Sequence, residues 1–265
     1  MADDTWNPAV YERFRKERSQ PFQDLAALVE PRPDMRVIDL GCGTGELTKT
    51  LHDRLSARQT LGIDSSDAML SRSVAFQAPG LSFEKRDIAE IARGWRRTPR
   101  PDAYDLVFSN AAIHWVPDHR ELLAQLASGL REDGQLAIQI PANDDHPAHA
   151  VARAVAREPP FAQALAGFVQ REPVHPPETY AGWLHDLGFE RQHVRLVVYP
   201  HVLPSREGVL EWVSGTLLVD YEKRLGSELF AAFRGRYREA LMQELPERRP
   251  LFYPFKRILF WGARS

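Results

Sequence analysis

Short apolar runs alternate with stretches of helical character over the first 141 residues of the chain. Leu47, Leu51 and Leu55 recur every fourth residue, a spacing that places side chains on one face of a helix. Further helices are expected over residues 67–76 and from residue 122 to a stop near residues 133–134. Strands that alternate with helices form a parallel sheet covered on both faces, and right-handed crossovers make it doubly wound. The runs that predict buried strands lie at residues 35–40, 59–64, 81–87, 104–110 and 134–141.

The pattern changes after residue 141. Residues 142–187 contain several prolines and two alanine-rich helical stretches, but no strand pattern. Residues 191–203 and 255–263 predict two further strands, and residues 206–245 predict two helices. We therefore expect an α/β fold with a doubly wound, mostly parallel, seven-stranded sheet of the Rossmann-like kind. Residues 142–187 and 206–245 are expected to form a helical cap over the mouth of the sheet, where the active site is expected.

The composition is typical of one globular domain. The chain has 265 residues, and 43% of them are hydrophobic, which excludes a disordered chain. It has one cysteine, which excludes a disulfide framework. It contains no apolar run long enough to span a membrane and no pattern of a signal peptide. We expect a single domain over residues 1–265 with an N-terminal helical cover at 1–30. A cytoplasmic location, no membrane partner, and a monomer or weak homo-oligomer are expected.

The charges are nearly balanced. The 34 basic and 36 acidic residues give a formal net charge of -2, which excludes a nucleic-acid binder driven by net charge. His146 and His149 lie three residues apart, but no third residue has a spacing suited to a metal site, so no metal is expected. One basic run, interrupted by Trp95, is interpreted as a solvated loop: Arg93, Arg96, Arg97 and Arg100.

A glycine-rich loop joins the first predicted strand to the following helix. Gly41, Gly43 and Gly45 allow a sharp turn and let a ligand approach the backbone without meeting a Cβ. Asp39 precedes them at the end of the strand. A carboxylate here would disfavour a pyrophosphate and favour a ligand that carries an ammonium or sulfonium group. Asp64, at the end of the second strand, is placed to accept both hydroxyls of a ribose.

The next two strands end in residues suited to the rest of a nucleoside. Asp87 and Ile88 follow the third strand and offer an acceptor for an exocyclic amine and an apolar contact for an adenine ring. Asn110 ends the fourth strand. Because ligands of open α/β sheets bind at the carboxyl ends of the strands, these groups are expected to face one site.

These motifs resemble those of the class I S-adenosylmethionine-dependent methyltransferases. Residues 37–45 are similar to the first motif of that family, and residues 62–66 to its second. The resemblance implies S-adenosyl-L-methionine as the cofactor. A Rossmann fold for another nucleotide, as in an NAD-dependent oxidoreductase or a non-catalytic nucleotide sensor, is the alternative. The expected cofactor-binding residues are Tyr11, Arg18, Asp39, Gly41, Gly43, Asp64, Ser65, Met69, Asp87, Ile88, Asn110 and Trp115.

The resemblance extends over nearly the whole chain to the trans-aconitate methyltransferases, a branch of that family. It rests on residues 6–8, 110–119, 139–141, 199–204 and 211–213 and on the tail around 254–263. It implies methyl transfer to a carboxylate of a small polycarboxylic acid, which gives a methyl ester. An ionised carboxylate needs no general base, so no catalytic residue is expected beyond those that orient the reactants. The expected substrate-binding residues are His114, Trp115, Asn143, Trp212 and Tyr221.

Two positions depart from that branch. Val219 stands where the resemblance implies an arginine able to clamp a carboxylate, and His114 replaces a glutamine before Trp115. These two departures affect the prediction of the acid more than the prediction of the reaction type. The sequence predicts neither which acid is the substrate nor which of its carboxylates is methylated. The alternatives within the class are a carrier-bound acyl carboxylate and a small-molecule hydroxyl.

Overall fold

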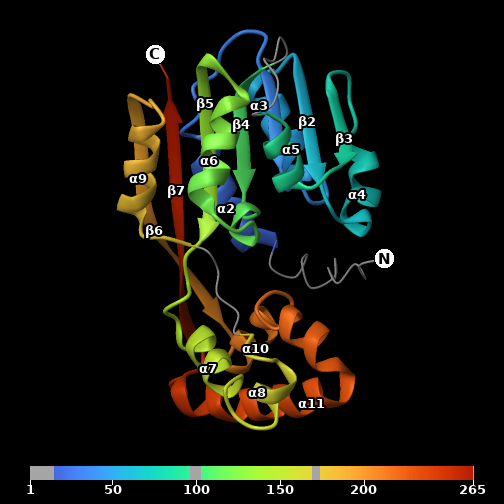
Figure 1. Cartoon of the computed structure of the whole chain (residues 1–265), viewed down its shortest axis with the longest axis vertical. Helices are drawn as coiled ribbons and strands as arrows, with labels where there is room; N and C mark the ends of the chain where they lie inside the picture. Colours follow the sequence, from blue (N-terminus) through green and yellow to red (C-terminus); the bar gives the residue numbers. More distant parts are fainter. Residues whose placement is uncertain (1–14, 96–102, 169–173, 265) are drawn as a thin grey trace.

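The computed structural model describes residues 15–95, 103–168 and 174–264, with side chains from Ser19 onward. These residues form one seven-stranded sheet in the order β3-β2-β1-β4-β5-β7-β6 (Figure 1). β7 runs antiparallel to both of its neighbours, and the pairs among β1 to β5 are parallel. The predicted fold class is confirmed. The strands are β1 Arg36–Leu40, β2 Gln59–Asp64, β3 Leu81–Lys85, β4 Tyr104–Asn110, β5 Leu130–Pro141, β6 Arg191–Leu203 and β7 Leu251–Ala263.

The strand boundaries differ from the prediction mainly where local contacts intervene. β3 ends at Lys85 because Asp87 begins a helix instead, its Oδ1 accepting a hydrogen bond from the Glu90 amide at 2.9 Å. β5 and β7 begin earlier than predicted, at Leu130 and Leu251. The other strands lie where the apolar runs indicated.

Helices cover both faces of the sheet. Alternate residues of each strand point to opposite faces, so Val37 belongs to the core layer that contains residues of α2 and α3, while Ile38 belongs to the layer that contains residues of α5, α6 and α9. Burial on both faces explains why the central strands β1 and β4 are mainly apolar. The helices beside the sheet are α2 Arg15–Ala26, α3 Glu46–Leu55, α4 Asp67–Ser73, η1 Val74–Phe76, α5 Ile88–Trp95, η2 Ile113–Trp115, α6 His119–Ser128 and α9 Pro177–Asp186.

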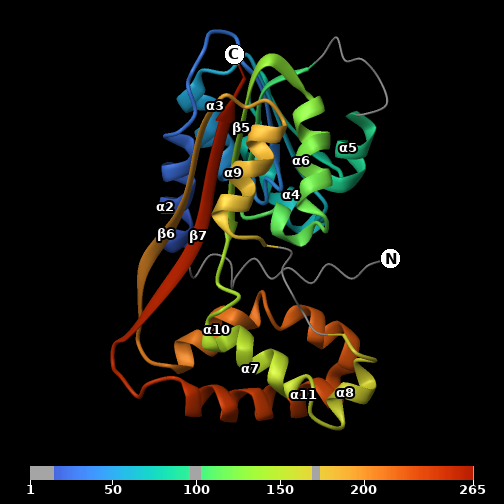
Figure 2. The same cartoon turned by 60° about the vertical axis from the view of Figure 1, so that its left-hand side comes forward.

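Two expectations about organisation need correction, and a third falls partly outside the described residues. The cap was expected to include residues up to 187, but α9 packs on β6 and β7, with Tyr180 stacked on Phe260 at 4.8 Å (Figure 2). Trp95 of the expected basic loop ends α5 and is buried against Tyr104, with ring centroids 5.5 Å apart, because it covers the sheet. Residues 1–14 of the expected N-terminal cover lie outside the described residues, and α2 covers a face of the sheet.

Within the described residues, the cap consists of four helices at one end of the molecule: α7 Pro147–Val155, α8 Phe161–Ala164, α10 Glu207–Ser214 and α11 Val219–Glu244 (Figures 1 and 2). β6 and β7 reach it because they remain paired as far as Leu203 and Leu251, well beyond the end of β5. Its core combines aliphatic and aromatic side chains, with Tyr221 stacked on Phe233 at 4.8 Å.

α11 bends at Gly226, whose φ of 70° favours glycine. None of the described helices is long and apolar enough to cross a membrane.

Candidate active site

The glycine loop after β1 is held close to the second strand. The amides of Gly41 and Cys42 both donate to the Ile63 carbonyl oxygen, at 2.8 and 2.9 Å. Gly41 has a φ of +76°, and a Cβ at this position would lie 2.2 Å from the Ala112 Cβ. Gly43 has a φ of +56°, but a Cβ there would meet nothing within 4 Å. Gly41 is therefore required by the approach of the loop after β4, while Gly43 borders open space.

Asp39 lies behind this loop. Its side chain is buried, and its Oδ2 accepts a hydrogen bond from Thr48 Oγ1 at 2.6 Å. Burial raises the pKa of the Asp39 carboxyl to about 7 against the opposing effect of the Thr48 hydrogen bond, and the negative charge of Asp64 adds to the rise. Asp39 is not among the residues that line the pocket, so the structure places its charge near the site and its side chain outside the wall.

Asp64 orders two segments that meet at the end of β2. Its Oδ2 accepts a hydrogen bond from the Gly43 amide, and its Oδ1 accepts one from the Ser66 amide, both at 2.9 Å. Ser66 in turn caps α4, its Oγ accepting from the Met69 amide at 3.2 Å. One carboxylate thus fixes both the glycine loop and the start of α4.

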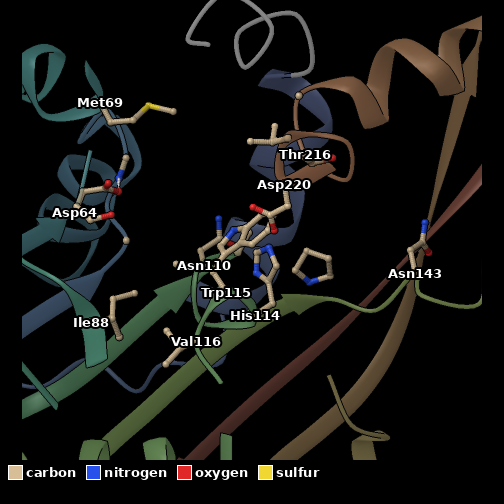
Figure 3. Close-up of a pocket in the computed structure, with 18 of the residues that line it drawn as sticks. Asp64, Met69, Ile88, Asn110, His114, Trp115, Val116, Asn143, Thr216 and Asp220 are labelled. Carbon is tan, nitrogen blue, oxygen red and sulfur yellow. Dashed lines mark hydrogen bonds between the residues drawn. The ribbon is translucent and has the colours of Figure 1, made fainter. Parts of the chain in front are cut away.

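A pocket of about 400 Å³ lies between these strand ends and the cap. Tyr11 lies outside the described residues, and the same holds for the Arg18 side chain. Figure 3 shows Asp64, Met69 and Ile88 on one side of the pocket, with Asn110, His114 and Trp115 nearer its centre. The expected cofactor-binding residues that line it are Gly41, Gly43, Asp64, Ser65, Met69, Asp87, Ile88, Asn110 and Trp115.

The segment after β4 forms the central wall. His114 is buried, and burial, followed by the positive charge of Arg257 and the neighbouring His119, lowers the pKa of its imidazole to about 3. Its ring lies 4.7 Å from that of Trp115, which is 39% exposed. The Asn110 Oδ1 is buried with no hydrogen-bond partner among the residues the structure describes. This wall therefore offers a neutral imidazole and an unused amide oxygen.

The expected substrate-binding residues divide into two groups. His114, Trp115, Asn143 and Trp212 line the pocket. Tyr221 does not, and this prediction is wrong: its side chain is fully buried in the cap core against Phe233 and Phe168. The residues of α11 that line the pocket are Val219, Asp220 and Lys223, which lie on another face of the helix.

Arg257 is the main residue of the pocket that sequence reasoning missed. It lies on β7, it is 4% exposed, and its Nη1 donates to Gln139 Oε1 at 3.2 Å. The sequence signal for Arg257 is a basic residue within a mainly apolar strand. Its place at the pocket, however, depends on the pairing of Arg257 on β7 with Pro141 on β5. A buried cation of the pocket thus comes from the last strand, while Val219 lines the cap side.

A strand-end glycine loop, two acidic groups behind and beside it, and a pocket beneath a cap fit an S-adenosylmethionine-dependent methyltransferase. The family model described as "Methyltransferase domain" matches residues 11–194. The trans-aconitate 2-methyltransferase of Deinococcus radiodurans is 44% identical over 98% of both chains. That of Variovorax paradoxus is 37% identical over 92% of this chain and 91% of the relative. The chain belongs to this methyltransferase family, in its trans-aconitate 2-methyltransferase branch.

Solved structures show the same fold at low sequence identity. The YcgJ protein of Bacillus subtilis has a TM-score of 0.58 at 16% identity, over 93% of this chain and 99% of that chain. Phosphoethanolamine N-methyltransferase 2 of Haemonchus contortus, in complex with S-adenosyl-L-methionine, has a TM-score of 0.53 at 14% identity, over 93% of this chain and 52% of that chain. Membership of the methyltransferase family excludes the two alternatives considered from the sequence, an NAD-dependent oxidoreductase and a nucleotide sensor.

Proposed function

We propose that this enzyme transfers a methyl group to one carboxylate of a small polycarboxylic acid, trans-aconitate or a close relative, and releases a methyl ester. The observation that carries the proposal is the 44% identity over 98% of both chains, because it includes the cap. α10, α11 and the turn between them supply Trp212, Asp220 and Thr216 to the pocket. The similarity therefore covers the wall opposite the strand ends as well as the cofactor motifs.

The residues on the strand-end side fit S-adenosylmethionine. Gly43 leaves open the space that a Cβ would fill, Asp64 presents a carboxylate for ribose hydroxyls, and Ile88 offers an apolar surface for adenine. The negative charges of Asp39 and Asp64 favour a ligand that carries positive charge. Met69 completes this side of the pocket. When bound, S-adenosylmethionine supplies a methyl group on a sulfonium, which an ionised carboxylate can accept.

The chain has only to position the acid. A carboxylate is ionised at pH 7, so no proton has to be removed before reaction. His114, the titratable ring of the central wall, is neutral at this pH because its pKa is about 3. Trp115 and Trp212 form flat walls around the acceptor. Orientation of this kind can contribute about 7–11 kcal/mol to lowering a barrier.

A panel assay tests the proposal and its alternatives. The enzyme is incubated with methyl-labelled S-adenosylmethionine and separate acceptors: di- and tricarboxylic acids, small hydroxyl compounds, and an acyl carrier protein with a free acyl carboxylate. We expect label in a base-labile product from the small acids alone. Label in a base-stable ether, or in the carrier protein only, would contradict the proposal.

The remaining parts of the proposal concern location and partners. We place the enzyme in the cytoplasm, acting as a monomer or weak homo-oligomer on a free small acid. The nearly balanced charge, with a formal net charge of -2, supports a small ligand over a nucleic acid.

A further inference from the structure

We propose that Arg257, Asn143 and His114 hold a second, non-reacting carboxylate, so that the enzyme selects acids with at least two carboxylates. The inference rests on the proposed carboxyl methyl transfer and assigns these residues a role in specificity. They come from three segments that are far apart in the sequence, namely β7, the chain after β5 and the chain after β4. All three line the same pocket.

Arg257 supplies a buried positive charge. Its side chain is 4% exposed, and its guanidinium carbon lies 4.8 Å from the centre of the Phe255 ring. Nη1 donates to the neutral amide of Gln139. A guanidinium that is stacked and hydrogen-bonded in this way is held in one orientation, which suits bidentate recognition of a carboxylate.

Asn143 adds a donor with a fixed direction. Its Oδ1 accepts a hydrogen bond from the Lys256 backbone amide at 2.8 Å, so the amide group cannot rotate freely. Its Nδ2 is buried and has no hydrogen-bond partner within the described part of the chain. The side chain as a whole is 1% exposed. A buried donor without a partner is costly, and a ligand oxygen at this position would satisfy it.

His114 completes the set. Its Nδ1 is also buried, without a hydrogen-bond partner in the described ranges. The positive charge of Arg257 is one of the influences that lower the pKa of this imidazole, and both residues line the pocket. A neutral imidazole with a proton on Nδ1 can donate to a carboxylate oxygen.

These residues lie away from the cofactor side. Figure 3 places Asn143 on the opposite side of the pocket from Asp64 and Met69, with His114 between them and Thr216 and Asp220 over the gap. The cofactor side carries Asp64, Asp87 and Arg86, and thus one more negative than positive charge.

On the substrate side, Asp220 and Lys223 of the cap carry opposite charges, so Arg257 leaves this side positive. A diacid can therefore present one carboxylate to the methyl group and the other to Arg257.

The test compares a triacid with a monoacid. trans-Aconitate is the triacid, and crotonate keeps the trans double bond with one carboxylate. Arg257→Met should lower kcat/KM for trans-aconitate by about 10- to 150-fold, mainly through KM, because a charge-assisted bond is lost. The value for crotonate should change by less than about threefold, since crotonate has no second carboxylate to lose that bond.

Further variants separate charge from shape. Arg257→Lys keeps the charge without the planar fork and should show an intermediate loss. Asn143→Asp keeps the shape of the side chain but replaces its donor with a carboxylate, so it should lower kcat/KM for trans-aconitate more than kcat/KM for crotonate. This variant tests the inference even if Arg257→Met does not fold. Arg236→Met, which removes an arginine paired with Glu158 outside the pocket, is the matched control.

The outcomes are distinguishable. Unchanged kinetics with trans-aconitate, or equal losses with both acids, would overturn the inference while ester formation by the wild type leaves the proposed function intact. If the wild type esterifies neither acid, the proposed function fails. In that case, calorimetry of trans-aconitate binding to the S-adenosylhomocysteine complex tests the carboxylate site on its own. Binding that depends on Arg257 supports the carboxylate site, and binding that does not depend on it refutes the site.

Discussion

Substitution of Asp64 tests how the strand ends hold the cofactor. Asp64→Ala removes a carboxylate that lines the pocket and accepts hydrogen bonds from the Gly43 and Ser66 amides, both at 2.9 Å. Two consequences are expected, one on ligand affinity and one on stability. They can be measured separately because the cofactor product, S-adenosylhomocysteine, carries the same ribose.

The magnitudes follow from the number and type of hydrogen bonds. Loss of a charged acceptor for the ribose hydroxyls should weaken binding by about 1.5–3 kcal/mol, or about 10- to 150-fold in Kd. The Gly43 and Ser66 amides also lose their acceptor, but both lie beside the pocket, where water can replace it. The free energy of unfolding should therefore fall by about 1–2 kcal/mol and the enzyme should stay folded.

Isothermal calorimetry with S-adenosylhomocysteine and thermal unfolding without ligand give the two quantities. Asp67→Asn is the matched control, because Asp67 is a nearby exposed aspartate that pairs with Lys85 and does not line the pocket. If Asp64→Ala lowers stability but leaves Kd unchanged, Asp64 supports the loop only, and the ribose assignment is refuted.

Two other predictions concern the glycine loop and the carboxylate behind it. Gly41→Ala should lower Tm more than Gly43→Ala: both have positive φ, but only at Gly41 would the new Cβ lie 2.2 Å from that of Ala112; equal Tm values would contradict the role of this contact. The affinity for S-adenosylmethionine should rise by up to about tenfold per pH unit as pH approaches 7, because the pKa of Asp39 is about 7 in the ligand-free protein and the bound cation favours its ionised form. Asp39→Asn should flatten this profile, and an unchanged profile would show that another group titrates. Because the folded-state pKa of Asp39 is raised, its contribution to stability is full below pH 4 and is lost as pH rises to about 7.

Much of the sheet and of the cofactor side could be predicted because their signals are local. The central strands β1 and β4 are buried on both faces and are therefore mainly apolar, and the glycines mark the turn that follows β1. The carboxyl ends of parallel strands meet at one edge, so the sequence predicts that Asp64, Ile88 and Asn110 lie at one site. The pocket contains all three.

The substrate side could not be predicted to the same degree because it depends on tertiary contacts. Arg257 reaches the pocket only through the register of β7 against β5. Tyr221 and Asp220 are neighbours in the sequence, but the turn of α11 buries one in the cap core and directs the other to the pocket. α9 has a helical pattern like those of the cap helices, and its contacts with Phe260 and the last strands decide its location.

Mass spectrometry of the reaction product gives the most direct test of the central claim, which is methyl transfer to a carboxylate in the pocket between the strand ends and the cap. Wild-type enzyme and Asp64→Ala are incubated with trans-aconitate and S-adenosylmethionine below the wild-type Kd of the cofactor. We predict a monomethyl ester that disappears on mild alkaline treatment and forms at least about tenfold more slowly with Asp64→Ala. A product that survives alkali, or the same rate with both enzymes, would contradict the account.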